Sequence, residues 1–141
     1  MKKQALYLLL LLKIFLLSSS CKKIDENFFK SMYIDLVQNG NYEKIPNYFS
    51  SDASINLDGK ELNYEEFIHR VKWMQKRNLT IDFKQALING NDVATWHFSQ
   101  IDNSTFKVFA RIKMKNNKIF RFEHIALKIQ GNAEQKVVND F

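Results

Sequence analysis

The chain has 141 residues, of which 45% are hydrophobic and 13% are aromatic, and its formal net charge is +6. This length fits one globular domain, and the single proline and four glycines exclude collagen-like or low-complexity architecture. Beyond residue 21 the lysines alternate with acidic residues instead of forming a block, and the chain contains no zinc-finger spacing or glycine-rich phosphate loop. The sequence therefore argues against nucleic-acid binding and predicts no metal or other cofactor.

The first 20 residues have the three parts of a secretory signal. Lys2 and Lys3 form a basic start, Ala5–Leu17 forms an apolar core, and small residues follow it. This core is shorter than the roughly 20 apolar residues that a membrane-spanning helix needs, and Lys13 interrupts it. We therefore expect residues 1–20 to be an export segment.

Cys21, the only cysteine of the chain, directly follows this segment. A single cysteine cannot form an internal disulfide, so it needs a different role. The stretch LSSSC that ends at Cys21 resembles a bacterial lipoprotein signal, in which the cysteine becomes the lipidated first residue. The resemblance implies an exported protein anchored to the cell envelope by acyl chains, and Lys22 implies the outer membrane if the cell is Gram-negative. The alternative is ordinary cleavage after Ser20, which leaves a free thiol.

A short tether over residues 21–26 is expected to precede the domain. Apolar residues recur every three or four positions over Asn27–Asn39, which predicts an amphipathic helix that Asp25 caps and Gly40 ends. The sequence NYEKIPNYF over residues 41–49 predicts a second, shorter helix.

A hairpin and a third helix are predicted next. Asp58–Gly59 lies between short alternating runs, which is typical of a β-hairpin turn. Asn63 followed by Glu66 predicts a capping box at the start of a helix. On this helix His69 lies off the apolar stripe, so we expect it to be solvated.

After residue 78 the apolar period changes from 3.6 to 2, and the alternating runs predict four strands over residues 79–88, 93–101, 105–114 and 119–129. Three helices followed by an antiparallel meander indicate an α+β domain over residues 27–130, in which the helices cover one face of a curved sheet. Residues 131–141 are expected to form a frayed tail.

The turn at Asn116–Asn117 predicts which residues face each other on the last two strands. A two-residue hairpin loop gives the following pairs: Met114 with Ile119, Ile112 with Arg121, Ala110 with Glu123 and Val108 with Ile125. A carboxylate on this inner, apolar face is costly to bury unless it is paired, and burial shifts its pKa toward the working range of a general base. Glu123 is therefore a candidate catalytic residue. The alternatives are a structural ion pair with Arg121 or a hydrogen bond between Glu123 and His97, either of which would only close the mouth of the core.

The preceding strand contributes either of two sets of side chains to the inner face. An ordinary register adds Thr95, His97 and Ser99, whereas a bulge would put Trp96 and Phe98 there. His97 is the second candidate catalytic residue.

The opposite sheet face is predicted to be apolar and basic, as a surface for subunit contact often is. Its members are predicted to be Lys107, Phe109, Arg111, Lys113, Phe120, Phe122 and His124.

The order of these elements resembles the SnoaL-like branch of the nuclear transport factor 2-like superfamily. The resemblance covers about residues 27–129 and rests on the stretches over residues 42–74, 88–98 and 112–127. It implies a cone, in which a bent antiparallel sheet wraps around a helix and encloses a pocket, and a dimer formed through the outer sheet face. In the catalytic members an Asp acts as acid or base at the position that Ala110 occupies here, so the resemblance implies that the usual carboxylate is absent.

Three functions remain open at this point. The first is an anchored domain that binds a small apolar molecule, with a pocket formed by Tyr64, Thr95, Trp96, His97, Ala110, Arg121 and Glu123. The second is a cyclase, isomerase or hydrolase in which Glu123 is the general base and His97 or Tyr64 is the donor. The third is an envelope scaffold that dimerises through Phe109, Phe120 and Phe122.

Overall fold

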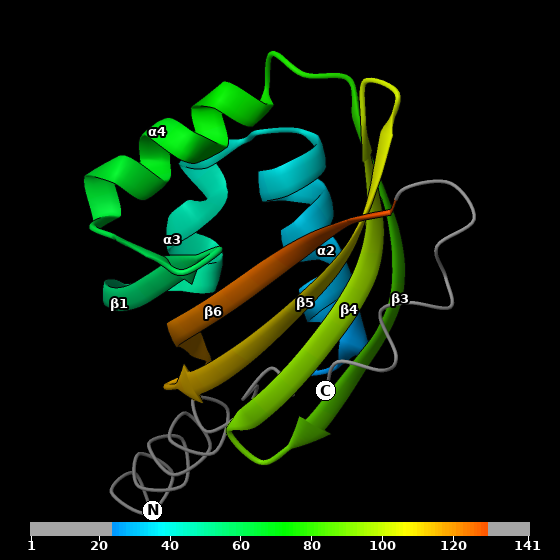
Figure 1. The fold of residues 1–141 in the computed structure, drawn as a ribbon. Helices are drawn as coiled ribbons and strands as arrows, with labels where there is room; N and C mark the ends of the chain where they lie inside the picture. The colour runs from blue at the N-terminus through cyan, green and yellow to red at the C-terminus, as the bar shows by residue number, and fades with distance from the viewer. Residues whose placement is uncertain (1–23, 130–141) are drawn as a thin grey trace, which may run out of the picture.

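The computed structural model describes residues 24–129, and the predicted signal segment, Cys21 and the predicted tail lie outside this range. A six-stranded sheet curves around the helices, which all lie on its concave side (Figure 1). In chain order the elements are α2 (Glu26–Met32), the π-helix η1 (Tyr33–Gln38), the 3₁₀-helix η2 (Tyr42–Lys44), α3 (Ile45–Tyr48), β1 (Phe49–Leu57), β2 (Lys60–Leu62), α4 (Tyr64–Met74), β3 (Leu79–Asn89), β4 (Asp92–Ile101), β5 (Ser104–Lys115) and β6 (Lys118–Ile129).

The sheet has the strand order β2-β1-β6-β5-β4-β3. The four strands from β3 to β6 form the predicted antiparallel meander, and β1 and β2 form the predicted hairpin. β1 pairs with β6 in the parallel direction, so the sheet is mixed. The α+β cone fold predicted from the sequence is thus confirmed.

The first predicted helix is capped at Asp25 and stops before Gly40 as expected, but it is an α-helix only to Met32 and continues as the π-helix η1 to Gln38. The Asp25 carboxylate accepts a hydrogen bond from the backbone N–H of Phe28 at 3.1 Å, which caps α2. Gly40 adopts a φ of 61°, and a Cβ at this position would lie 2.3 Å from the backbone nitrogen of Gln75. Gly40 therefore ends the helical segment and also allows the end of α4 to approach closely.

α4 starts with the predicted capping box. The Asn63 side chain accepts from the backbone N–H of Glu66, and the Glu66 carboxylate accepts from the backbone N–H of Asn63, both at 2.9 Å. Phe67 and Val71 on this helix are buried against the sheet, whereas His69 is exposed as expected. This packing holds α4 against β1, where the rings of Phe67 and Phe49 lie 4.9 Å apart.

The hydrophobic core fills the space between the helices and the concave sheet face. Its fully buried members come from every layer and include Phe29, Tyr33, Ile45, Ile55, Ile112 and Ile119. Because these side chains fill most of the cone, little empty space remains inside it. Each of them stabilises the fold by about 1.5–3 kcal/mol relative to an exposed position.

Candidate functional site

The concave face of β4 carries the side chains expected from an ordinary register. Thr95 faces Ala110 and His97 faces Val108, and Thr95 and His97 are almost completely buried, as is Ser99. Trp96 accordingly points to the outer face of the sheet. Of the two registers that the sequence left open, the structure therefore has the one without a bulge between β4 and β5.

β5 and β6 pair with a bulge that the sequence analysis did not include. Met114 faces Ile119 as predicted, but Lys113 then faces Arg121, which makes Phe120 an extra residue in β6. Because side chains alternate between the two faces of a strand, an extra residue moves every later side chain to the opposite face.

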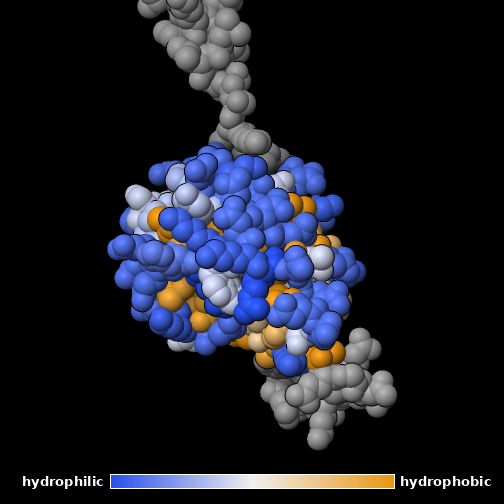
Figure 2. Space-filling model, turned by 90° about the horizontal axis from the view of Figure 1, so that it is seen from above, coloured by the Kyte–Doolittle hydropathy of each residue, from blue (hydrophilic) through white to orange (hydrophobic). Residues whose placement is uncertain are grey.

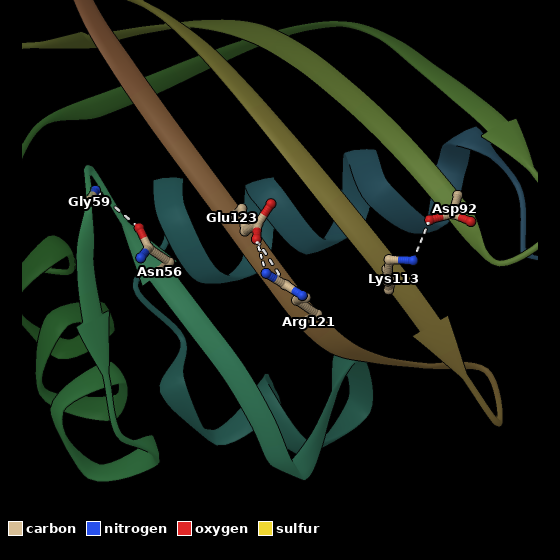
Figure 3. Close-up of polar contacts among 6 residues, drawn as sticks. All are labelled: Asn56, Gly59, Asp92, Lys113, Arg121 and Glu123. Carbon is tan, nitrogen blue, oxygen red and sulfur yellow. Dashed lines mark hydrogen bonds and ion pairs between the residues drawn. The ribbon is translucent and has the colours of Figure 1, made fainter.

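The bulge reverses the predicted positions on β6. Ala110 faces His124 and Ile112 faces Phe122, so His124 and Phe122 point into the cone. Arg121 and Glu123 lie on the outer face, where Arg121 Nη2 is 2.6 Å from Glu123 Oε1 (Figure 3). The prediction that Glu123 and Arg121 line the pocket is wrong, whereas the alternative of an ion pair between them matches the structure.

A cavity of about 60 Å³ lies between η1, α4 and the ends of β1 and β6. Most of its wall is apolar, and charged or titratable side chains enter it mainly at Asp58, Arg70 and His124. The residues that line it are Met32, Tyr33, Leu36, Val37, Phe49, Leu57, Asp58, Phe67, Arg70, Val71, Met74, Phe122 and His124. This cavity is the candidate binding site.

His124 and Asp58 approach each other at the wall of the cavity. Asp58 follows β1 with a φ of 54°, and its Oδ1 accepts a hydrogen bond from the backbone N–H of Ala126 at 2.7 Å. The same oxygen lies 3.9 Å from Nδ1 of His124, a buried nitrogen that has no hydrogen-bond partner among the described residues. Burial and, less strongly, the Arg70 cation lower the pKa of His124, although the Asp58 carboxylate opposes this shift. His124 is therefore neutral at pH 7 and able to accept or donate one hydrogen bond.

A second polar group lies deeper in the cone. Tyr33, at the first position of η1, shares a hydrogen bond of 2.6 Å with Thr95 Oγ1, and its ring lies 4.3 Å from the His97 ring. Burial and, less strongly, the neighbouring His124 lower the pKa of His97 to about 3. Of these residues Tyr33 reaches the cavity wall, whereas Thr95 and His97 lie behind it.

Arg70 supplies the cation of the cavity. Its guanidinium lies 4.6 Å from the centre of the Trp73 ring, and the guanidinium of Arg77 lies 4.4 Å from the same ring. Arg77 also pairs with Asp102 at 3.1 Å and does not line the cavity. The two arginines thus share Trp73 as a neighbour, but of the two only Arg70 lines the cavity and can contact a molecule in it.

The remaining residues of the predicted pocket lie outside the cavity wall. Tyr64 is half-buried against the core at the start of α4. Ala110 is buried on the concave face of β5, opposite Thr95. Trp96 lies on the outer face, where Lys107 Nζ is 5.3 Å from its ring. Phe122, predicted as a dimer contact, is also misplaced because it is buried inside the cone.

The residues that sequence reasoning missed are Asp58, Arg70 and His124. One signal was available for His124, since the predicted register placed two charged residues in succession on a face that is otherwise apolar. A bulge that exchanged Arg121 and Glu123 for Phe122 and His124 gives a more apolar inner face. Asp58 and Arg70 had no such signal, because both lie on elements whose ends meet only in the folded cone.

Among residues 24–129 there is no cluster of three or more His, Cys, Asp or Glu side chains that could hold a metal ion. No helix in this part of the chain is long and apolar enough to cross a membrane.

Comparison with known proteins gives a match in structure and none in sequence. No protein-family model and no curated protein matches the chain. A candidate polyketide cyclase from Acidithiobacillus ferrooxidans superimposes with a TM-score of 0.62 at 13% identity, over 77% of this chain and 91% of the other. A candidate ketosteroid isomerase from Kribbella flavida gives 0.60 at 10% identity, over 72% and 76% of the two chains.

A third similar structure is described by its fold alone. It is an NTF2-like protein of unknown function from Cytophaga hutchinsonii, with a TM-score of 0.57 at 12% identity, over 78% of this chain and 95% of the other. These three structures share the fold of this chain at 10–13% sequence identity. The described part of the chain has the nuclear transport factor 2-like fold that the SnoaL-like resemblance implied.

Proposed function

We propose that this protein is a lipid-anchored domain of the cell envelope that binds a small, mostly apolar molecule with one polar group. The observation that carries this proposal is the cavity, whose apolar wall is interrupted by His124, Asp58 and Arg70. Ligand sites commonly combine an apolar wall with a few convergent polar groups that orient the ligand.

The size of the cavity limits the ligand. A volume of about 60 Å³ is several times the roughly 10–15 Å³ that one water needs, but it is far below the roughly 300–1,000 Å³ of sites for drug-sized molecules. The ligand is therefore small, or it enters with only its apolar end. Its polar group is an oxygen that accepts a hydrogen bond from the Arg70 guanidinium at the cavity wall.

Phenol, toluene and benzoate test this reading, because they share a ring and differ in the polar group. We expect chemical-shift changes in NMR titrations at the cavity residues, with phenol binding about five-fold more tightly than toluene, since one net hydrogen bond contributes about 1 kcal/mol. Val71→Leu, which adds one carbon to the cavity wall, should weaken binding of all three. Arg70→Gln should weaken phenol and benzoate, whereas Arg77→Gln is the matched control and should leave both unchanged. Equal binding by all variants would refute the site.

The anchor is supported by the position of Cys21 after an export segment and three residues before Ile24, where the described structure begins. Several acyl chains would hold the domain at a membrane surface while it remains in water. We expect an acylated Cys21 in the intact mass of the full-length protein purified from membranes, and a shift of Cys21→Ser to the soluble fraction. An unmodified thiol in the membrane-purified protein would contradict the anchor.

A second candidate function, acid–base catalysis, is favoured by one observation. His124 is neutral, lines the cavity and lies 3.9 Å from Asp58, which could orient the imidazole once a substrate is bound. A general base in such a position takes a proton from a bound carbon or oxygen acid. His124 thus has the role that the sequence analysis gave to Glu123.

Proton abstraction from 5-nitrobenzisoxazole provides a test that needs no knowledge of the natural substrate. We expect elimination above the buffer rate, with activity that falls only when the pH drops through the lowered pKa of His124. His124→Gln should abolish this activity. Glu123→Gln should retain it, because Glu123 lies on the outer face. Activity that survives His124→Gln would exclude this mechanism.

A further inference from the structure

The end of the sheet formed by the β3–β4 turn carries exposed apolar side chains on both faces. Leu87, which pairs with Ala94 on the outer face, is 60% exposed. Ile88 pairs with the buried Val93 on the inner face and is still 40% exposed, because the helices do not cover it. An apolar tip that is open on two sides fits insertion into a fluid layer better than docking on a flat protein surface.

This tip lies at the end of the domain where the described chain begins. The Glu26 carboxylate, in the first turn of α2, accepts a hydrogen bond from the backbone N–H of Ala86 at 3.1 Å. The start of α2 therefore lies directly beside the last residues of β3, as Figure 1 also shows. Ile24 precedes this turn by two residues.

The tether is too short to hold this end of the domain far from a membrane. Three peptide units separate Cys21 from Ile24, and they span at most about 11 Å. If acyl chains on Cys21 lie in the bilayer, the start of α2 and the adjoining β3–β4 tip lie within reach of the headgroups.

The charges at this end are mixed, and the tip itself carries none. Gly90 and Asn91 of the turn are uncharged, and the following Asp92 is paired with Lys113 at 3.2 Å (Figure 3). Lys115 in the adjacent hairpin is exposed, and so are Asp25 and Glu26 at the start of α2. An uncharged apolar tip can enter the surface of a bilayer without burying a charge. The opposite end of the molecule is mostly hydrophilic and shows only small, separate hydrophobic patches (Figure 2).

We propose that the β3–β4 tip, with Leu87 and Ile88, inserts into the surface of the membrane to which Cys21 anchors the chain. This inference rests on the proposed lipid anchor. Two contacts, the acyl chains and the tip, then fix the orientation of the domain, with the β3–β4 tip toward the lipid and α4 away from it.

The test uses the full-length protein, produced in a bacterial host that processes lipoproteins and reconstituted in phosphatidylethanolamine–phosphatidylglycerol vesicles. Cys21 is the only cysteine, so Leu87→Cys and the control Thr80→Cys, at the other end of β3, each provide one free thiol for an environment-sensitive fluorophore. Quenching by lipids that carry a nitroxide on the acyl chain reports insertion. We expect at least threefold stronger quenching at position 87 than at position 80, and a reduction at position 87 when Ile88→Asp is added.

Each alternative outcome is distinguishable. An acylated protein with equal quenching at positions 87 and 80 overturns the inserted tip and leaves the anchor intact. An unacylated mass overturns the anchor and the tip together. Self-quenching between labels on neighbouring copies, without quenching by lipid, identifies a second copy of the chain as the occupant of the tip and overturns the proposal.

Discussion

The buried imidazole of His97 should make the stability of this domain depend on pH. His97 is 1% exposed, its Nδ1 has no hydrogen-bond partner among the described residues, and its titratable neighbours are Tyr33 and His124. Burial lowers its pKa from 6.5 to about 3, so the folded state holds the neutral form. The contribution of the neutral His97 to the free energy of unfolding is therefore fully present above pH 6.5. It is lost progressively as the pH falls from 6.5 toward 3.

The magnitude follows from proton linkage. Between pH 7 and pH 5 the unfolded chain protonates His97 and the folded chain does not, which costs about 2 kcal/mol of unfolding free energy. That loss is a substantial part of the roughly 5–15 kcal/mol by which ordinary domains are stable. His124 adds to the loss in the same direction, because burial also lowers its pKa.

The variant His97→Leu isolates the contribution of one histidine. At pH 7 it loses the ring contact with Tyr33, worth about 0.5–1.5 kcal/mol, but it also removes a buried nitrogen without a partner, so we expect a small net change. Urea unfolding at pH 7 and pH 5 should show that the variant loses about 2 kcal/mol less than the wild type between the two pH values. His69→Gln, which changes an exposed histidine on α4, is the control and should follow the wild type. An equal loss in His97→Leu and the wild type would refute the assignment of a neutral, buried His97.

Two further predictions concern other parts of the structure. On the outer sheet face Phe109 and Ile125 pair with each other and are 40% and 55% exposed. If this face forms a dimer, Phe109→Glu should lower the sedimentation coefficient to that of the monomer. An unchanged sedimentation coefficient would exclude this interface. Gly40→Ala should destabilise the domain by more than about 2 kcal/mol, because the added Cβ would collide with the backbone of Gln75 and because Gly40 has a positive φ. A melting temperature within a degree of that of the wild type would contradict this close approach.

Local sequence signals predicted the elements of this fold well. The caps at Asp25 and Asn63, the stop at Gly40 and the turn at Asp58–Gly59 each depend on residues that are close in the sequence, and all of them are present in the structure. Such features need no knowledge of the distant parts of the chain. The face on which His97 lies was not settled in this way, because the sequence allowed either an ordinary register or a bulge between β4 and β5. The structure has the ordinary register, with His97 inside the cone.

The candidate site was harder to predict because it depends on distant contacts. Asp58 reaches the cavity through the turn after β1, Arg70 through α4 and His124 through β6, and these elements meet only when the parallel pairing of β1 with β6 closes the cone. Counting residues outward from each turn predicts the pairing of strands that are neighbours in the sequence, but it does not predict the pairing of β1 with β6. The bulge at Phe120 then inverted the prediction for the residues of β6 that follow it.

Deleting Phe120 would test directly whether the bulge alone sets the faces of β6. Without the extra residue, Met114 can face Ile119 and Lys113 can face Arg121 in a regular ladder, so Phe122 and His124 stay inside the cone and Arg121 and Glu123 stay outside. The deletion removes one half-buried side chain and the local bend of the strand. We therefore expect the variant to keep a cooperative unfolding transition by circular dichroism, with a loss of about 1–3 kcal/mol of unfolding free energy. The absence of a cooperative transition would contradict this reasoning, because it would show that the fold needs the bulge itself and not only the faces that the bulge assigns to the later residues of β6.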